Sequence, residues 1–314
     1  MRAIVIHAAK DLRVEERKPE TAGPGEVEVA IEAGGICART STILLQPRRL
    51  RHRPPARADD PRSRGAGRIV AIGAGVHGLS IGERVAVSPS RPCGACDYCI
   101  KGLPNQFLDM RFYGPAMPFP HIQGAFRERL VARVSQCHKV DDGIAIGEAT
   151  LAEPCAVTLH AVDRAGSLLD KRVLVTGCGP IGALAIIAAR AYGAREIVAT
   201  DVSETIPGFA GRIGADRTIN VATNPEALAA YGANKGSFDV QFEASGNAAA
   251  IRSGVDVLRP RGVLVQLGLG DDIAIPQNLV VAGKWRFAAP SGSTPSSVSL
   301  STSSTVVGST SHRF

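Results

Sequence analysis

Two different hydrophobic periods divide the chain. Near its start, EVEVAIEA (residues 26–33) alternates polar and apolar positions with the period of two that is typical of a half-buried β-strand. Further short β-rich runs, RAIVIH, GRIVAIGAGV and ERVAVSP, are separated by turns rich in Pro and Gly. This pattern predicts a small, mostly β domain over residues 1–145.

The pattern changes near residue 170. RVLVTG, EIVATD, FDVQFEASG and GVLVQLGLG have the apolar character of buried strands, and GPIGALAIIAARAYGA predicts a long apolar-faced helix. Strands that alternate with helical stretches imply right-handed βαβ crossovers and a parallel sheet. We therefore expect an α/β chain in which a doubly wound Rossmann domain occupies residues 146–282.

Two segments follow neither period. Residues 38–64 crowd Pro and Arg together, and residues 283–314 contain 14 Ser and Thr among 32 positions. Such compositions are poorly suited to burying a core. We interpret both segments as aberrant within the two-domain pattern.

Charge is concentrated in the same two segments. The chain has 36 Lys and Arg against 29 Asp and Glu, a net charge of +7. Residues 38–64 carry a net +6 and the tail +3, which leaves −2 for the rest. A nucleic-acid partner would depend on the eight Arg of residues 38–64, which lack interleaved aromatic residues, so we expect no nucleic-acid binding.

The remaining composition suits an enzyme of the cytoplasm. An apolar fraction of 45%, with 34 Gly and 4% aromatic residues, fits an α/β enzyme rich in tight turns. No run approaches the roughly 20 apolar residues of a membrane span, and the first residues lack the order of a signal peptide. We therefore expect a cytoplasmic protein with no membrane contact.

A glycine-rich turn follows the strand RVLVTG. The sequence GCGPIG fits the fingerprint of a dinucleotide site, in which the first glycine allows a tight turn, the second lets backbone approach a pyrophosphate and the third allows close helix packing. An acid at the end of the next strand can bind both ribose hydroxyls and repel a 2′-phosphate, which favours NAD over NADP. The predicted cofactor-binding residues are Gly177, Gly179, Pro180, Ile181, Gly182 and Asp201.

Cys93, Cys96 and Cys99 form a C-x2-C-x2-C cluster in a loop after a strand. Thiolates at this spacing can converge on one tetrahedral zinc ion, although a closed structural site has four ligands. The next candidates, Cys137 and His138, lie far along the chain. A metal site is nonetheless a better interpretation than disulfides in a reducing compartment.

Together these motifs resemble the zinc-containing medium-chain alcohol dehydrogenases. GPGEVEVAIEAGGIC, GERVAVSPSRPCGACDYCIKGLPN, GEATLAEPCAVTLHAV and VLVTGCGPIGALAIIAARAYGA occur in the family's order. RFYG and QGAFRERL are similar to the polyol branch, which contains the sorbitol and L-idonate 5-dehydrogenases. The resemblance covers residues 1–37 and 65–282.

This resemblance implies a GroES-like catalytic domain, a Rossmann domain that binds NAD, and a catalytic zinc that lowers the pKa of a bound alcohol. Cys37 matches the first ligand of that zinc, and Glu153 matches a carboxylate held at or near it. Cys93, Cys96 and Cys99 match three of four ligands of a structural zinc. Phe107 occupies the fourth position and cannot bind metal.

The resemblance fails within residues 38–64. The His and Glu that complete the family's catalytic zinc site fall on Ser63 and Arg64, and an arginine has no lone pair to offer a cation. Parts of both aberrant segments can be encoded so that a neighbouring reading frame gives family-like sequence in family order. We interpret both as frameshift products; the alternative is a diverged basic insert with a function of its own.

The prediction that follows is a zinc-dependent, NAD-linked oxidoreductase that converts a secondary alcohol of a polyol or sugar acid, such as L-idonate, into a ketone. Cys37 and Glu153 are its candidate catalytic residues, and we expect this chain to have impaired activity. The alternatives are a zinc-free quinone-reductase-like oxidoreductase, which has no need of CGACDYC, and an inactive NAD-binding remnant. Family members assemble as dimers or tetramers, so a homo-oligomer is expected. Glu243 and Ser245 are interpreted as shaping the turn after a Rossmann strand.

Overall fold

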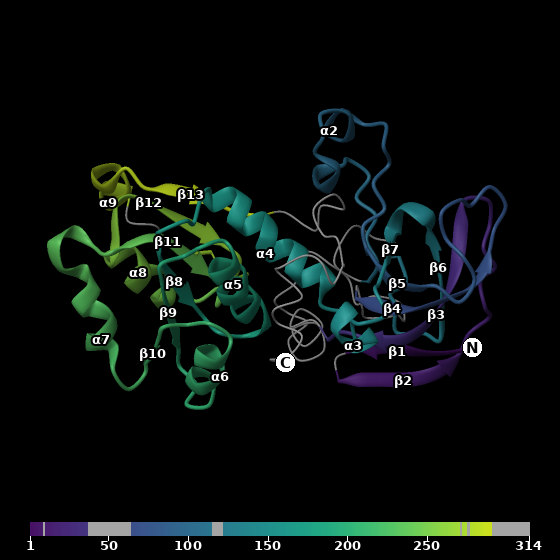
Figure 1. Ribbon diagram of the computed structural model, residues 1–314, viewed down its shortest axis with the longest axis horizontal. Helices are drawn as coiled ribbons and strands as arrows, with labels where there is room; N and C mark the ends of the chain where they lie inside the picture. Colours follow the sequence, from purple (N-terminus) through teal and green to yellow (C-terminus); the bar gives the residue numbers. More distant parts are fainter. Residues whose placement is uncertain (9, 37–63, 115–121, 271, 275–276, 291–314) are drawn as a thin grey trace. The chain divides into compact units, whose positions relative to one another are not determined.

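The computed structural model describes residues 1–8, 10–36, 64–114, 122–270, 272–274 and 277–290 (Figure 1). These residues form two compact units, one of residues 1–153 and one of residues 154–290. Most of the segment 38–64, the candidate ligand Cys37 and the tail from residue 291 lie outside the described residues. No described helix is long and apolar enough to cross a membrane.

The first unit consists mainly of antiparallel strands. A two-stranded sheet contains β1 (Arg2–Ala8) and β2 (Asp11–Glu16), and a five-stranded sheet has the order β6-β3-β4-β5-β7. The larger sheet contains β3 (Glu26–Gly34), β4 (Gly65–Ile72), β5 (Arg84–Val87), β6 (Arg129–Arg133) and β7 (Cys137–Lys139). Short helices in this unit are α2 (Asp97–Ile100), η2 (Pro104–Gln106), η3 (Val134–Gln136) and α3 (Ile146–Ala149).

Alternation along β3 explains how this sheet forms its core. Val27 and Val29 point to the buried face and are fully buried, whereas Glu26 and Glu28, which alternate with them, remain partly exposed. Ile69, Val85 and Leu130 from the neighbouring strands complete the same cluster. The half-buried pattern of the sequence thus corresponds to one apolar face of an antiparallel sheet.

The second unit is a parallel six-stranded sheet with helices in its connections. Its strand order is β10-β9-β8-β11-β12-β13. The strands are β8 (Arg172–Thr176), β9 (Glu196–Asp201), β10 (Arg217–Asn220), β11 (Phe238–Glu243), β12 (Leu258–Gln266) and β13 (Arg286–Ala288). The helices are α4 (Ala152–Ala165), which begins at the boundary of the two units, α5 (Pro180–Ala191), α6 (Ile206–Arg212), α7 (Pro225–Ala229), η4 (Ala230–Lys235), α8 (Ala248–Asp256) and α9 (Gln277–Gly283).

The chain order in this sheet reverses between β8 and β11. Counted from β8, the strands are arranged 3-2-1-4-5-6, which is the order of a Rossmann fold. Ligands of such sheets bind beyond the carboxyl ends of the strands at the reversal point. The prediction of an α/β chain with a mostly β domain and a parallel Rossmann sheet is confirmed.

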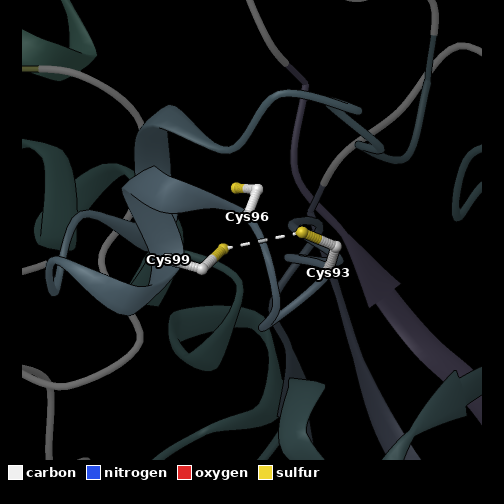
Figure 2. Close-up of side chains that lie close together, drawn as sticks. All are labelled: Cys93, Cys96 and Cys99. Carbon is white, nitrogen blue, oxygen red and sulfur yellow. Dashed lines mark hydrogen bonds between the residues drawn. The ribbon is translucent and has the colours of Figure 1, made fainter.

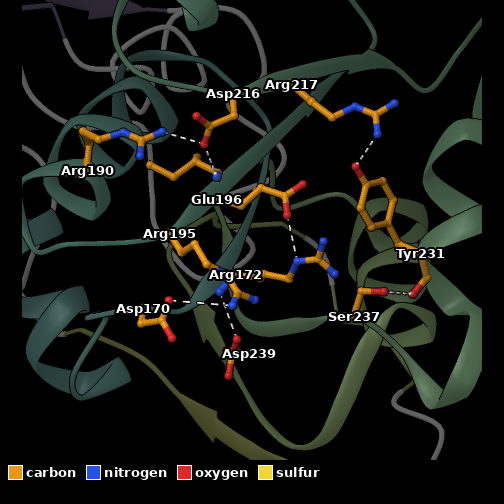
Figure 3. A network of polar contacts seen from close by, with 11 residues as sticks. Asp170, Arg172, Arg190, Arg195, Glu196, Asp216, Arg217, Tyr231, Ser237 and Asp239 are labelled. Atoms are coloured by element: carbon orange, nitrogen blue, oxygen red, sulfur yellow. Dashed lines mark hydrogen bonds and ion pairs between the residues drawn. The ribbon is translucent and has the colours of Figure 1, made fainter.

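Charged side chains hold together the opposite, amino edge of the parallel sheet (Figure 3). Arg172 at the start of β8 donates from Nε to Glu196 at the start of β9 at 2.7 Å, and its backbone N–H reaches Asp239 of β11 at 2.9 Å. Asp239 is buried and pairs with Lys171 and Arg259. These contacts tie neighbouring strands at one edge, while the other edge supplies the loops of the candidate site.

The first residues of the Ser/Thr-rich tail belong to the Rossmann unit. β13 pairs in parallel with β12, and the Trp285 side chain packs among apolar residues and donates from Nε1 to the Arg259 carbonyl at 3.0 Å. Arg286 donates to the carbonyls of Arg164 and Ala165 at the end of α4. Residues 286–288 therefore extend the sheet, and Trp285 and Arg286 attach this segment to the rest of the unit.

Candidate functional site

The glycine-rich loop lies at the reversal point of the Rossmann sheet. Gly177 follows β8 with a φ of +84°, a conformation that favours glycine, and its N–H donates to the Thr200 carbonyl at 2.8 Å. A Cβ on Gly177 would lie 2.8 Å from the Ser245 backbone nitrogen. The loops after β8 and β11 therefore meet here, and only a glycine permits the approach.

The other two glycines of the motif differ in their surroundings. A Cβ on Gly182 would lie 1.8 Å from the Gly177 carbonyl oxygen, so this glycine lets helix α5 pack against the loop. Gly179 caps the start of α5, and no atom lies within 4 Å of a Cβ placed on it. Pro180 and Ile181 begin the helix behind it. The arrangement leaves open space at the amino end of α5, a helix of twelve residues. The partial positive charge at the amino end of a helix attracts anions.

Asp201 ends β9 and joins two loops. Its Oδ2 accepts a hydrogen bond from the Cys178 N–H at 2.7 Å, and its Oδ1 accepts from Val202 and Ser203 N–H at 2.8 and 2.9 Å. The carboxylate is only partly buried, so lone pairs remain for a ligand's hydroxyls. Burial, with the nearby Asp201 charge, raises the pKa of the Cys178 thiol to about 12, so this cysteine is a packing residue.

Glu243 binds together the loops around the same edge. Its side chain is 0% exposed, and its carboxylate accepts from Ser245 N–H at 2.9 Å, from Gly246 N–H at 3.0 and 3.1 Å and from Gln266 Nε2 at 2.6 Å. The Ser245 hydroxyl donates to it as well. We call these contacts the Glu243 clamp. Its sequence signal is an acidic residue inside an apolar strand, followed by Ser and Gly. The interpretation that Glu243 shapes the turn agrees with the contacts to Ser245 and Gly246 but did not predict the bond to Gln266.

The cysteine cluster gathers in the first unit as the spacing predicts. The Sγ atoms of Cys93, Cys96 and Cys99 all lie within 4.8 Å of one another, and those of Cys93 and Cys99 are 3.8 Å apart (Figure 2). The backbone N–H groups of Cys99 and Leu108 lower the pKa of the Cys96 thiol to about 6. Thiolates at these separations fit a tetrahedral zinc ion, whose 2.3 Å bonds place sulfurs roughly 3.8 Å apart.

An ion pair between two side chains lies where the resemblance implies the catalytic zinc. Arg64 donates from Nε to Oε2 of Glu153 at 2.9 Å, and the two side chains are only 10% and 13% exposed. Cys37 and Ser63 lie outside the described residues, so the predicted partnership of Cys37 with Glu153 stays a prediction. Glu153 already has a cationic partner that is part of the chain. Among the described residues, this site does not fit a zinc ion.

The sequence alone did not predict this ion pair. Arg64 directly precedes β4, and Glu153 lies in the first turn of α4, so their partnership is a property of the folded first unit. The only available signal was that an arginine stands at a position where the resemblance requires a metal ligand. A carboxylate left without its metal in a partly buried place needs another cation.

Comparisons with known proteins agree with the fold. Residues 23–142 match the alcohol dehydrogenase GroES-like domain, and residues 180–297 match the zinc-binding dehydrogenase domain. L-idonate 5-dehydrogenase (NAD(P)(+)) of Escherichia coli is 40% identical over 222 residues, which span 67% of this chain and 63% of that enzyme. The match thus covers less than two thirds of that relative's length.

Two further relatives match over more of their length. Sorbitol dehydrogenase of Gallus gallus is 31% identical over 284 residues, 86% of this chain and 76% of that enzyme. The crystal structure of L-idonate 5-dehydrogenase from Escherichia coli superposes with a TM-score of 0.86 at 31% identity, and covers 96% of this chain and 86% of the other. The chain therefore belongs to the zinc-binding alcohol dehydrogenase family with a GroES-like domain, within its polyol dehydrogenase branch.

Proposed function

We propose that the Rossmann unit of this chain binds NAD(H). Gly177, Gly179 and Gly182 would hold the pyrophosphate loop, with Pro180 and Ile181 opening the helix whose amino end faces it. Support comes from the open space at Gly179 and the close packing at Gly182. Asp201 would accept hydrogen bonds from the ribose hydroxyls and repel a 2′-phosphate, which favours NAD over NADP.

We further propose that the ancestral reaction is oxidation of a secondary alcohol of a polyol or sugar acid to a ketone. When bound, the nicotinamide ring supplies the hydride acceptor for that chemistry. The E. coli and chicken relatives, named for L-idonate and sorbitol, support a small hydroxylated substrate. Cys37 and Glu153 remain its proposed catalytic residues.

In this chain, hydride transfer is proposed to be severely impaired. The observation that carries the proposal is the ion pair between Arg64 and Glu153, because a guanidinium at this place repels a divalent cation and occupies the carboxylate. No step of the reaction is therefore assigned to a zinc ion held at Glu153.

The cysteine cluster weighs against the zinc-free alternative. Cys93, Cys96 and Cys99 would hold a zinc ion, and a quinone-reductase-like ancestor has no need of such a cluster. An NAD-binding remnant agrees with all described features. We also propose that the chain forms a homo-oligomer, which light scattering tests.

The test combines binding with turnover. Purified protein is titrated with NADH, followed by the fluorescence of the bound nicotinamide, and is then assayed with NAD and either L-idonate or sorbitol beside the E. coli relative. We expect saturable NADH binding and turnover about a thousandfold or more below the relative, because a Lewis acid contributes several kcal/mol to such a step. Comparable turnover would overturn the proposed impairment, and absence of NADH binding would overturn the cofactor proposal.

A further inference from the structure

The cysteine cluster presents three sulfur ligands and no fourth ligand among the described residues. No described carboxylate, imidazole or additional thiol joins the group of Cys93, Cys96 and Cys99 within 4.8 Å. The separation of 3.8 Å between the Cys93 and Cys99 sulfurs matches one edge of a tetrahedron around zinc. The described residues therefore provide three corners of a coordination tetrahedron and not the fourth.

An apolar side chain stands where the family's fourth ligand is expected. Phe107 follows Cys99 by eight positions, caps the end of η2 and is only 2% exposed. The next residue, Leu108, directs its backbone N–H at the Cys96 sulfur, so the chain at this point passes beside the cluster. A buried phenyl ring has no lone pair, and it cannot close the coordination sphere.

Solvent reaches the same cluster. Cys93 is exposed, and Cys96 and Cys99 are partly exposed. A zinc ion with four protein ligands serves as a structural site, whereas three protein ligands leave one position for a molecule from solution. The exposure of the sulfurs provides the path for that molecule.

We propose that Cys93, Cys96 and Cys99 form an open three-thiolate metal site, whose fourth position binds a small ligand from solution. This rests on the proposed zinc binding of the cluster. Three thiolates and a divalent metal carry a net charge of −1, so a neutral donor binds there with less repulsion than an anion. The ligand class is a neutral, monodentate nitrogen donor such as an imidazole, which suits zinc and cobalt alike.

The test uses cobalt(II) as a spectroscopic probe in the full-length chain, under reducing conditions. The cobalt absorption bands depend on the ligands of the ion, so imidazole that enters the fourth position shifts them. We expect a saturable shift in the unchanged protein. In Phe107→Cys, where a fourth thiolate is supplied, we expect no response to imidazole and zinc affinity raised by roughly a hundredfold.

Controls separate this inference from folding and from the cofactor proposal. Cys93→Ser should lose cobalt binding, while NADH titration of the same samples reports on the Rossmann unit independently. A cobalt spectrum in the unchanged protein that is indifferent to imidazole would overturn the open site, since the fourth position would already be closed. Failure of the unchanged protein to bind cobalt would overturn it too. If Phe107→Cys does not fold, the titration of the unchanged protein still decides.

Discussion

Arg64 and Glu153, 89 positions apart, form an ion pair with a distance of 2.9 Å between Nε and Oε2. The pair links the residue before β4 to the first turn of α4 within one compact unit. Where the family resemblance implies a metal bound by a carboxylate, this chain supplies its own cation. The same contact therefore supports the fold and opposes the chemistry.

The stability of the first unit should depend on this pair. Arg64→Met is expected to lower the free energy of unfolding by about 3 kcal/mol, because Glu153 would remain nearly buried without its partner. Urea denaturation measures the change. The matched control is Arg68→Met, whose pair with Glu32 is 49% and 38% exposed and should be worth less than about 1 kcal/mol. Equal losses for both variants would contradict the assigned role.

Replacing either of two glycines of the dinucleotide loop by alanine should have different effects on stability and on NADH binding. Gly179→Ala meets no atom within 4 Å, so thermal stability should be retained while NADH binding weakens, because the new methyl group occupies the approach to the helix end. Gly182→Ala places its Cβ 1.8 Å from the Gly177 carbonyl oxygen, so this variant should lose stability as well. Melting curves and NADH titrations distinguish the two. An unchanged NADH affinity in Gly179→Ala would argue against pyrophosphate binding there.

The carboxylate of Asp201 should set the preference between the two nicotinamide cofactors. Asp201→Asn keeps one oxygen acceptor for the Val202 and Ser203 N–H groups, turns an NH2 toward the Cys178 N–H, and removes the negative charge that would face a 2′-phosphate. The ratio of NADPH to NADH affinity should rise by about tenfold, which corresponds to about 1.4 kcal/mol. Paired titrations measure the ratio at low salt, where charge effects are largest. If the ratio stays constant, Asp201 does not discriminate.

Glu243 should act on cofactor binding by positioning the loops. In Glu243→Gln an amide NH2 would face the N–H donors of Ser245 and Gly246, and a buried mismatch of this kind costs about 1–3 kcal/mol. We expect lower stability and weaker NADH binding. Ser245→Ala, which removes the hydroxyl's bond to Glu243 and its acceptor for the Asn247 N–H but leaves the carboxylate in place, is the control and should lose less of both. If Glu243→Gln loses stability but keeps NADH affinity, the clamp has no influence on the cofactor site.

The sequence predicted those parts of the site that depend on local requirements. The spacing of the three glycines predicted a tight turn at Gly177 and close helix packing at Gly182, and the structure shows both. The role of Gly179 in the approach of a pyrophosphate stays a prediction. The convergence of Cys93, Cys96 and Cys99 followed for the same reason, since a run of seven residues contains the whole cluster.

Contacts between residues that are far apart along the chain could not be predicted from the sequence. The ion pair of Arg64 with Glu153 joins two residues of the first unit that are 89 positions apart, and the Glu243 clamp depends on β11 and β12 being neighbours. The tail was set apart by composition, yet Trp285 and β13 pack onto the Rossmann sheet. Composition reports the average of a segment and misses the few residues at its start that complete a sheet.

The aberrant segments are expected to have a common origin in shifted reading frames. Arg64 is the last residue of the first segment, and the family pattern resumes at Gly65, the first residue of β4, as a restored frame would require. Determining the nucleotide sequence across codons 37–66 and 280–314 tests this. We expect a neighbouring frame to encode the family's run after Cys37 and its His-Glu pair in place of Ser63 and Arg64. DNA that encodes the present residues without such an alternative would instead indicate a diverged insert, and the cation beside Glu153 would then be an inherited property of this enzyme.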